Sequence, residues 1–195
     1  MDLIEYALKE NIGHPDLFTG RKQFMDNFEH WIYIVRKELG KSRALLSRRK
    51  KGKTVFMQRL YNIIWTQNDK VVPFFYEIKE KEMTLSDFAE DFLCSFLSQY
   101  YAFNTRKTQY ILNPPRLSEL KRIFQDDEFI LRIINSLNTE KENRNYDAMW
   151  DVSRKAPHAI AAFRNIRVLQ FIDEFQNINK FIYDKNHRPI HTLAG

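Results

Sequence analysis

Three short apolar runs, separated by long amphipathic segments, restrict what this chain of 195 residues can fold into. They cover residues 43–47, 71–78 and 166–172, and each predicts a buried strand. Strands that alternate with helices predict an α/β fold with a parallel sheet and right-handed crossovers. The second run contains Pro73, which lacks a backbone donor. We therefore expect this strand to lie at a sheet edge or to begin after the proline.

Apolar residues between these runs recur at spacings of three and four, which is typical of helices. A short helix is also expected within residues 1–19, and residues 139–145 are expected to form a polar loop. Pro157 either bends the last predicted helix or starts a new one. The predicted helices cover residues 20–39, 54–65, 85–103, 117–138 (as two helices that meet near 125–127) and 146–164.

The composition favours a folded protein from a reducing compartment. Hydrophobic residues make up 44% of the chain and aromatic residues 14%, which argues against disorder. The single cysteine, Cys94, excludes an internal disulfide and predicts a cytoplasmic protein, with Cys94 as a small buried hydrophobe. The N-terminus has no signal-peptide pattern, and no stretch approaches the ~20 apolar residues of a membrane span. The five histidines show no metal-ligand spacing.

The net charge of +6 permits contact with nucleic acid or another polyanion. Much of the excess lies at Arg43 and in the run 48–51. Basic residues around a phosphate site account for such an excess by themselves. We therefore leave both interpretations open and favour the phosphate site.

Residues 47–54, with the sequence Ser-Arg-Arg-Lys-Lys-Gly-Lys-Thr, resemble the Walker A motif with Ser47 in the first glycine position. An expected strand leads in and an expected helix leads out, so loop amides and a helix N-terminus face the phosphates. Gly52 lets the backbone approach closely, Lys53 reaches the β- and γ-phosphates, and Thr54 holds Mg²⁺. The expected nucleotide-binding residues here are Ser47, Arg48, Arg49, Lys50, Lys51, Gly52, Lys53, Thr54 and Val55.

Residues 168–174 resemble the Walker B motif, in which an apolar strand delivers carboxylates to the carboxyl end of a parallel sheet. Asp173 is expected to hold Mg²⁺ through a water, together with Thr54, because Mg²⁺ keeps several waters in its shell. Glu174 is expected to activate the attacking water, and Lys53 is the second expected catalytic residue. The two motifs lie about 120 residues apart and are more specific together than either is alone.

The pair of motifs resembles the division of P-loop NTPases that carry a glutamate after the Walker B aspartate. Within it the chain is similar to AAA+-related ATPases of the archaeal-ATPase, origin-recognition and STAND (signal-transduction) type. Residues 16–24 resemble the segment that borders the adenine in those families, which makes Leu17, Phe18, Gly20 and Arg21 candidate adenine-side residues. Gln23 stands where the families have glutamate. The resemblance covers residues 16–178.

The resemblance also implies a further strand between the two motif strands, with a polar sensor residue, and a helical lid. Residues 175–195 contain no candidate for either. We therefore expect an incomplete three-layer P-loop fold: a leading segment and helix over 1–40, a partial ATPase core over 41–178 with a helical insertion over about 79–165, and a tail over 179–195. Downstream domains, another subunit or a second copy of the chain are the expected source of the rest.

Three functions remain open at this point. The favoured one is an ATP- and Mg²⁺-dependent ATPase module that acts as a conformational switch in a larger protein. The second is a DNA-binding module of the origin-recognition kind, whose basic loop contacts phosphates. The third is a scaffold that binds nucleotide without hydrolysing it, with the aromatic helices over 85–103 and 146–164 as a docking surface.

Overall fold

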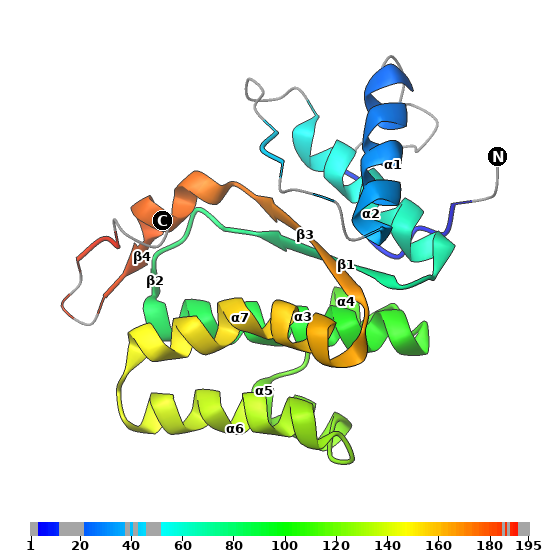
Figure 1. Ribbon diagram of the computed structural model, residues 1–195. Coiled ribbons are helices and arrows are strands. Elements are labelled where there is room, and N and C mark those ends of the chain that lie inside the picture. Colours follow the sequence, from blue (N-terminus) through cyan, green and yellow to red (C-terminus); the bar gives the residue numbers. More distant parts are fainter. Residues whose placement is uncertain are drawn as a thin grey trace.

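The computed structural model describes residues 4–11, 22–37, 40, 43–45, 52–184, 186 and 188–190. Within these residues the chain is a mixed α/β protein with short parallel strands, as the sequence predicts. Figure 1 shows β1 and β3 between helices α1 and α2 on one side and α3 and α7 on the other. The elements, in chain order, are α1 (Lys22–Arg36), α2 (Lys53–Gln67), β1 (Val71–Glu77), β2 (Met83–Thr84), α3 (Leu85–Thr105), α4 (Gln109–Leu112), α5 (Leu117–Ile123), α6 (Glu128–Glu142), α7 (Tyr146–Arg164), β3 (Arg167–Asp173), η2 (Phe175–Asn177), α8 (Ile178–Phe181) and β4 (Ile182–Tyr183).

Strands β1 and β3 pair in parallel along their whole length, from Val71 opposite Arg167 to Glu77 opposite Asp173. In the part of the chain that the structure describes, β1 has no second strand neighbour and starts at Val71, before the proline. Of the two alternatives that Pro73 allowed, the edge position therefore holds there. The side chain of Gln99, on α3, covers this edge. It accepts a hydrogen bond from the Phe75 amide at 2.9 Å and donates one to the Phe75 carbonyl at 2.8 Å. These bonds satisfy backbone groups that an open edge would leave unpaired.

The helix that follows the predicted phosphate loop packs between β1 and α1. It begins after Gly52, whose φ of 71° is in the left-handed region that favours glycine. Phe56 in its first turn is fully buried and contacts Phe28 of α1, with ring centroids 5.0 Å apart. Because neighbours cover most of its circumference, α2 is apolar on more than one face.

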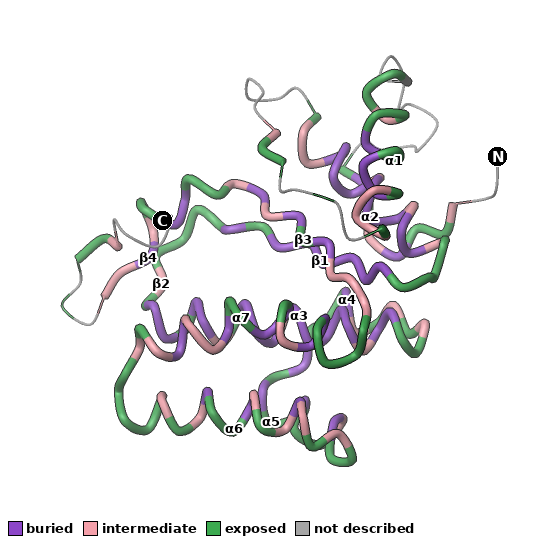
Figure 2. The backbone as a smooth tube through the Cα atoms, viewed as in Figure 1, coloured by how far each residue is buried: buried purple, intermediate pink, exposed green. Residues whose placement is uncertain are grey.

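Helices α3 and α7 cover the other face of the sheet through an aromatic core. Phe74 of β1 is fully buried, and its ring lies 5.2 Å from that of Phe92 and 5.3 Å from that of Phe96. Trp150 of α7 contacts Phe92 from the other side at 5.3 Å. Figure 2 shows the buried residues concentrated where these helices meet the strands. Cys94 is buried as predicted, and burial raises the pKa of its thiol to about 12.

Helices α5 and α6 form a further layer beneath α7 (Figure 1). The prediction of two helices that meet near 125–127 is confirmed, because α5 ends at Ile123 and α6 starts at Glu128. The predicted loop over 139–145 is wrong in its first half, since α6 continues to Glu142. Helix α7 runs through Pro157 without interruption. Four residues before this proline, the Ser153 hydroxyl donates a hydrogen bond to the Ala89 carbonyl of α3 at 2.7 Å.

The N-terminal segment 4–11 lies along α2 in a non-helical conformation, so the short helix predicted within 1–19 is absent from these residues. Side chains at four-residue intervals on α2 bind the backbone of this N-terminal segment. Asn62 bonds the amide and the carbonyl of Leu8, both at 2.9 Å, and Thr66 accepts from the Glu5 amide at 2.8 Å. Because α2 supplies these partners, the segment needs no secondary structure of its own.

One further prediction requires correction, and the residues after Glu174 add elements that the sequence did not indicate. Residues 43–45 have no strand conformation, and the rest of the predicted strand over 43–47 lies outside the described residues. The residues after Glu174, in which the sequence offers no candidate for a strand between the two motif strands, form η2, α8 and β4. Strand β4 pairs in parallel with β2, Met83 opposite Ile182 and Thr84 opposite Tyr183, in a small sheet separate from β1 and β3. Strands of two residues give too short an apolar pattern to recognise.

Candidate functional site

The start of α2 meets the end of β3 through two side chains that follow Gly52. Lys53 Nζ lies 2.9 Å from Oδ1 of Asp173, and the Thr54 hydroxyl donates a hydrogen bond to Oδ2 of the same carboxylate at 2.5 Å. Lys53 Nζ also lies 3.6 Å from Oε1 of Glu174. The structure therefore brings together Lys53, Thr54, Asp173 and Glu174, which the two sequence motifs single out.

Asp173 is the buried centre of this group. Its side chain has no exposed surface, whereas those of Lys53 and Glu174 are 25% and 30% exposed. A buried carboxylate requires charged or hydrogen-bonding partners, and Lys53 and Thr54 supply them. Partial burial by itself lowers the pKa of Lys53. The hydrogen bond and charge of Asp173, with the charge of Glu174, outweigh burial and raise the pKa above its usual value.

Glu174 sits in a left-handed turn immediately after β3, with φ at 51° and ψ at 39°. Its amide donates to Oδ1 of Asp173 at 2.9 Å, and its carbonyl accepts from the Asn177 amide at 2.8 Å. The side-chain amide of Gln176 donates to Oε2 of Glu174. Asn177 is buried, and its side chain donates to the Ile78 carbonyl at 2.8 Å, which ties the turn to the end of β1.

Sequence reasoning did not identify Gln176 and Asn177, although their place directly after the Walker B-like residues was an available signal. It also missed Glu77, which lies opposite Asp173 at the end of β1. Partial burial and the negative charges of Asp173 and Glu174 raise the pKa of Glu77, while Lys79 offsets part of the effect. Three carboxylates therefore gather at this end of the sheet.

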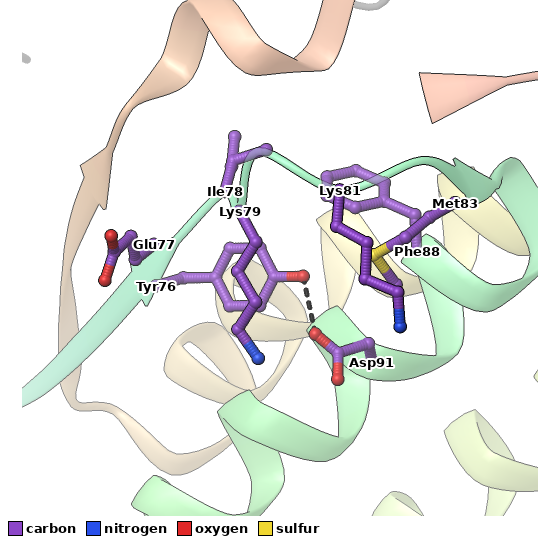
Figure 3. Close-up of a pocket in the computed structure, with 8 residues that line it drawn as sticks. All are labelled: Tyr76, Glu77, Ile78, Lys79, Lys81, Met83, Phe88 and Asp91. Atoms are coloured by element: carbon purple, nitrogen blue, oxygen red, sulfur yellow. Dashed lines mark hydrogen bonds between the residues drawn. The ribbon is translucent and has the colours of Figure 1, made fainter. Parts of the chain in front are cut away.

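A small pocket lies beside the same end of β1 but is distinct from the four motif residues. Figure 3 shows Tyr76 pointing toward α3, where its hydroxyl donates to Asp91 at 2.7 Å, and Glu77 pointing the opposite way. Burial, with the charge of Asp91, raises the pKa of Tyr76. Its described lining consists of Tyr76, Glu77, Ile78, Lys79, Lys81, Met83, Phe88 and Asp91, and so includes none of Gly52, Lys53, Thr54 and Val55.

The other predicted site residues divide into two groups. Val55 is described, and it is buried in the first turn of α2. The remaining predictions lie outside the described residues and receive no structural account: Ser47, Arg48, Arg49, Lys50, Lys51, Leu17, Phe18, Gly20 and Arg21.

The oxygen atoms of Thr54 and Asp173 are the kind of ligand that Mg²⁺ prefers. Within the described ranges, no cluster of three or more His, Cys, Asp or Glu side chains could hold a metal ion by itself. Mg²⁺ in nucleotide sites does not require such a cluster, because it takes one or two protein ligands and completes its shell with phosphate oxygens and water. The adjacent Thr54 hydroxyl and Asp173 carboxylate match that smaller requirement.

Comparison of the chain with models of known protein families, with curated proteins and with solved structures finds no match. Over the residues that the structure describes, no helix has both the length and the apolar composition for crossing a membrane.

Proposed function

We propose that this chain is an ATP-binding, Mg²⁺-dependent P-loop ATPase module that acts as a conformational switch within a larger protein. One observation carries the proposal: Lys53 and Thr54 contact the carboxylate of Asp173 across more than a hundred residues of chain. A chance Gly-Lys-Thr before a helix has no reason to meet the acid at the end of a distant strand. The parallel pairing of β1 with β3 and the helices on both faces of the sheet are compatible with the P-loop fold.

Each of the four side chains has a part in this function. Lys53 exchanges its contacts with Asp173 and Glu174 for the β- and γ-phosphates of ATP. Thr54 and Asp173 hold Mg²⁺, which neutralises the charge on the phosphates when it is bound. Glu174 accepts a proton from the attacking water as a general base. The positive end of the α2 dipole, directly after Gly52, favours the negative charge of the phosphates.

Substitution of Lys53 tests the binding site. We expect Lys53→Ala to weaken the binding of a fluorescent ATP analogue by at least about tenfold, because the cation next to the phosphates is lost. Lys121→Ala, at an exposed position on α5, removes the same charge far from the site and should leave the Kd unchanged. Equal affinity of the Lys53→Ala and parent proteins would show that the site is assigned to the wrong residues.

Substitution of Glu174 separates an ATPase from a non-hydrolysing scaffold. Glu174→Gln keeps the shape and removes the base, so turnover should fall by about 100-fold or more while ATP binding persists. Turnover is measured as phosphate release from the purified chain. ATP binding without turnover in the parent protein favours the scaffold. Turnover that survives in Glu174→Gln excludes this glutamate as the base.

The proposal includes a cellular setting and a set of partners. A single buried cysteine suits a reducing compartment such as the cytoplasm. The partners that we propose are ATP and the further domains or subunits whose arrangement the switch controls, a second copy of this chain among them. Contact of the basic run 48–51 with nucleic acid is the competing use of that loop, and steep salt dependence of DNA binding would reveal it.

A further inference from the structure

The carboxylate of Glu174 is held from two sides by different side chains. On one side, Lys53 Nζ lies 3.6 Å from Oε1. On the other side, the Gln176 side-chain amide donates a hydrogen bond to Oε2. These are the two side chains that contact this carboxylate in the described part of the chain, and they leave its oxygens in different environments.

Glu174 precedes η2 in a left-handed conformation that is not explained by the C-terminal end of a helix. Five described non-glycine residues have positive φ, and four of them, Asn68, Arg106, Arg144 and Asn165, end helices, where the left-handed conformation is ordinary. Glu174 is the fifth, and it follows a strand. Such strain costs on the order of 1–3 kcal/mol and is retained where the surrounding contacts impose it, which is common at functional positions.

The strained turn brings Gln176 back to Glu174 and holds it there. The bond from the Asn177 amide to the Glu174 carbonyl closes the turn at 2.8 Å. The buried side chain of Asn177 then fastens the turn to the Ile78 carbonyl at the end of β1. Gln176 therefore projects from a turn that is anchored to both strands of the sheet, and its reach to Oε2 does not depend on a free loop.

We propose that Gln176 is a positioning residue that orients the Glu174 carboxylate toward the water that attacks ATP, an inference that rests on the proposed function. In the proposed function Lys53 turns from Glu174 to the phosphates, so nucleotide binding releases the contact on the Oε1 side. Gln176 then keeps Oε2 in place and leaves Oε1 free to accept a proton from the attacking water. The reacting groups themselves remain Glu174 and Lys53.

The test compares substitutions that remove, reverse or keep the donor at position 176. Gln176→Leu and Gln176→Glu should lower kcat by at least about tenfold, since small errors in the placement of a catalytic group are costly. The KM for ATP and the Kd of an ATP analogue should change by less than about twofold, because Gln176 contacts the base and not the phosphates. Gln176→Lys keeps a donor and should recover part of kcat. Gln125→Leu, exposed between α5 and α6, is the matched control.

A parent-like kcat in Gln176→Leu would overturn the assignment, as would parallel losses of binding and turnover, which indicate a structural role. Failure of the proposed function has a different signature: the parent chain either does not bind ATP or binds it independently of Lys53. If Glu174-dependent turnover is insensitive to position 176, the proposed function stands and the role of Gln176 does not.

A second measurement does not depend on turnover. In NMR spectra of the full chain, the side-chain amide signals of Gln176 should shift in Glu174→Ala, because the acceptor for its hydrogen bond is gone, while those of Gln125 stay in place. Unchanged Gln176 signals would show that the contact is absent in solution and would overturn the inference.

Discussion

Thr54 and Asp173 lie 119 residues apart in the chain, and the hydroxyl of the first donates a hydrogen bond to the carboxylate of the second at 2.5 Å. The first turn of α2 presents Thr54, and the last position of β3 presents Asp173. Neither position depends on a long loop of uncertain conformation, because a helix start and a strand end determine them. This contact defines where we expect the metal ion and the phosphates.

The first prediction concerns the Mg²⁺ dependence of ATP binding. Asp173→Asn keeps the volume of the side chain and an acceptor for Thr54, but it removes the charge that attracts Mg²⁺. The parent protein should bind an ATP analogue more tightly in Mg²⁺ than in EDTA, and this difference should shrink by at least about tenfold in the variant. Titrations in the two buffers measure it. Asp126→Asn, at an exposed position between α5 and α6, is the control and should keep the parent difference in affinity between Mg²⁺ and EDTA. If Asp173→Asn also kept that difference, the metal assignment would be contradicted.

The second prediction concerns Glu77 and the pH dependence of stability. Its pKa in the folded protein is raised above the usual 4.5 by burial and by Asp173 and Glu174. A raised pKa means that Glu77 favours folding below its unfolded pKa, and that this contribution is lost as the pH rises through the folded pKa. Glu77→Gln cannot ionise, so it should raise the Tm at about pH 7 and have little effect at about pH 4.

Thermal unfolding at both pH values, followed by circular dichroism, measures the effect of Glu77→Gln. Glu82→Gln removes a carboxylate from an exposed position shortly after β1 and serves as the control. A Tm that falls at neutral pH in Glu77→Gln would mean that the carboxylate makes a favourable contact there and that repulsion is not its main interaction.

The third prediction concerns the N-terminal segment. The carboxylate of Glu10 has a side-chain exposure of 1% and binds the Arg59 guanidinium at 2.7 and 2.8 Å, with Asn62 as a third partner at 3.2 Å. Arg59→Met leaves this charge buried and should lower the free energy of unfolding by about 3 kcal/mol. In the double variant Glu10→Gln with Arg59→Met, part of that loss should be recovered, because no buried charge remains.

Urea unfolding of the single and double variants measures the coupling between Glu10 and Arg59. Arg132→Met breaks a solvent-exposed pair with Glu128 and should change stability little, which controls for the loss of an arginine. If the double variant is no more stable than Arg59→Met, the Glu10 carboxylate is not the source of the cost, and the segment is held by its backbone bonds to α2.

The long amphipathic segments were predictable because their pattern is local. Helix α7 begins and ends where the spacing of its apolar residues predicts, and the break between α5 and α6 falls at the expected place. The strand over 71–78 was recognisable from its continuous apolar run, and Pro73 indicated an edge position as one of two alternatives. The exact end of α6 was missed, because polar residues at a helix terminus give no apolar pattern.

Contacts between distant segments were not available from local pattern. Nothing in the sequence around Gln99 indicates that its amide covers the edge of β1, and nothing around Asn62 indicates that it binds the backbone of Leu8. Polar side chains in helices usually face water, so their burial here depends on the backbone groups that the fold brings to them. The pairing of β2 with β4 likewise joins segments that are distant in the chain, so local pattern does not indicate it.

The sequence by itself determined the class of fold and named Lys53, Thr54, Asp173 and Glu174 as a set, because strand and helix periodicity and the spacing of chemical motifs are written along the chain. Only the tertiary structure decided how these four residues meet, which oxygen of Asp173 each partner takes, and that Glu77 and Gln176 stand beside them. The reason is physical: periodicity depends on neighbours in sequence, whereas a hydrogen bond depends on positions in space that the packing of α2 against the sheet sets.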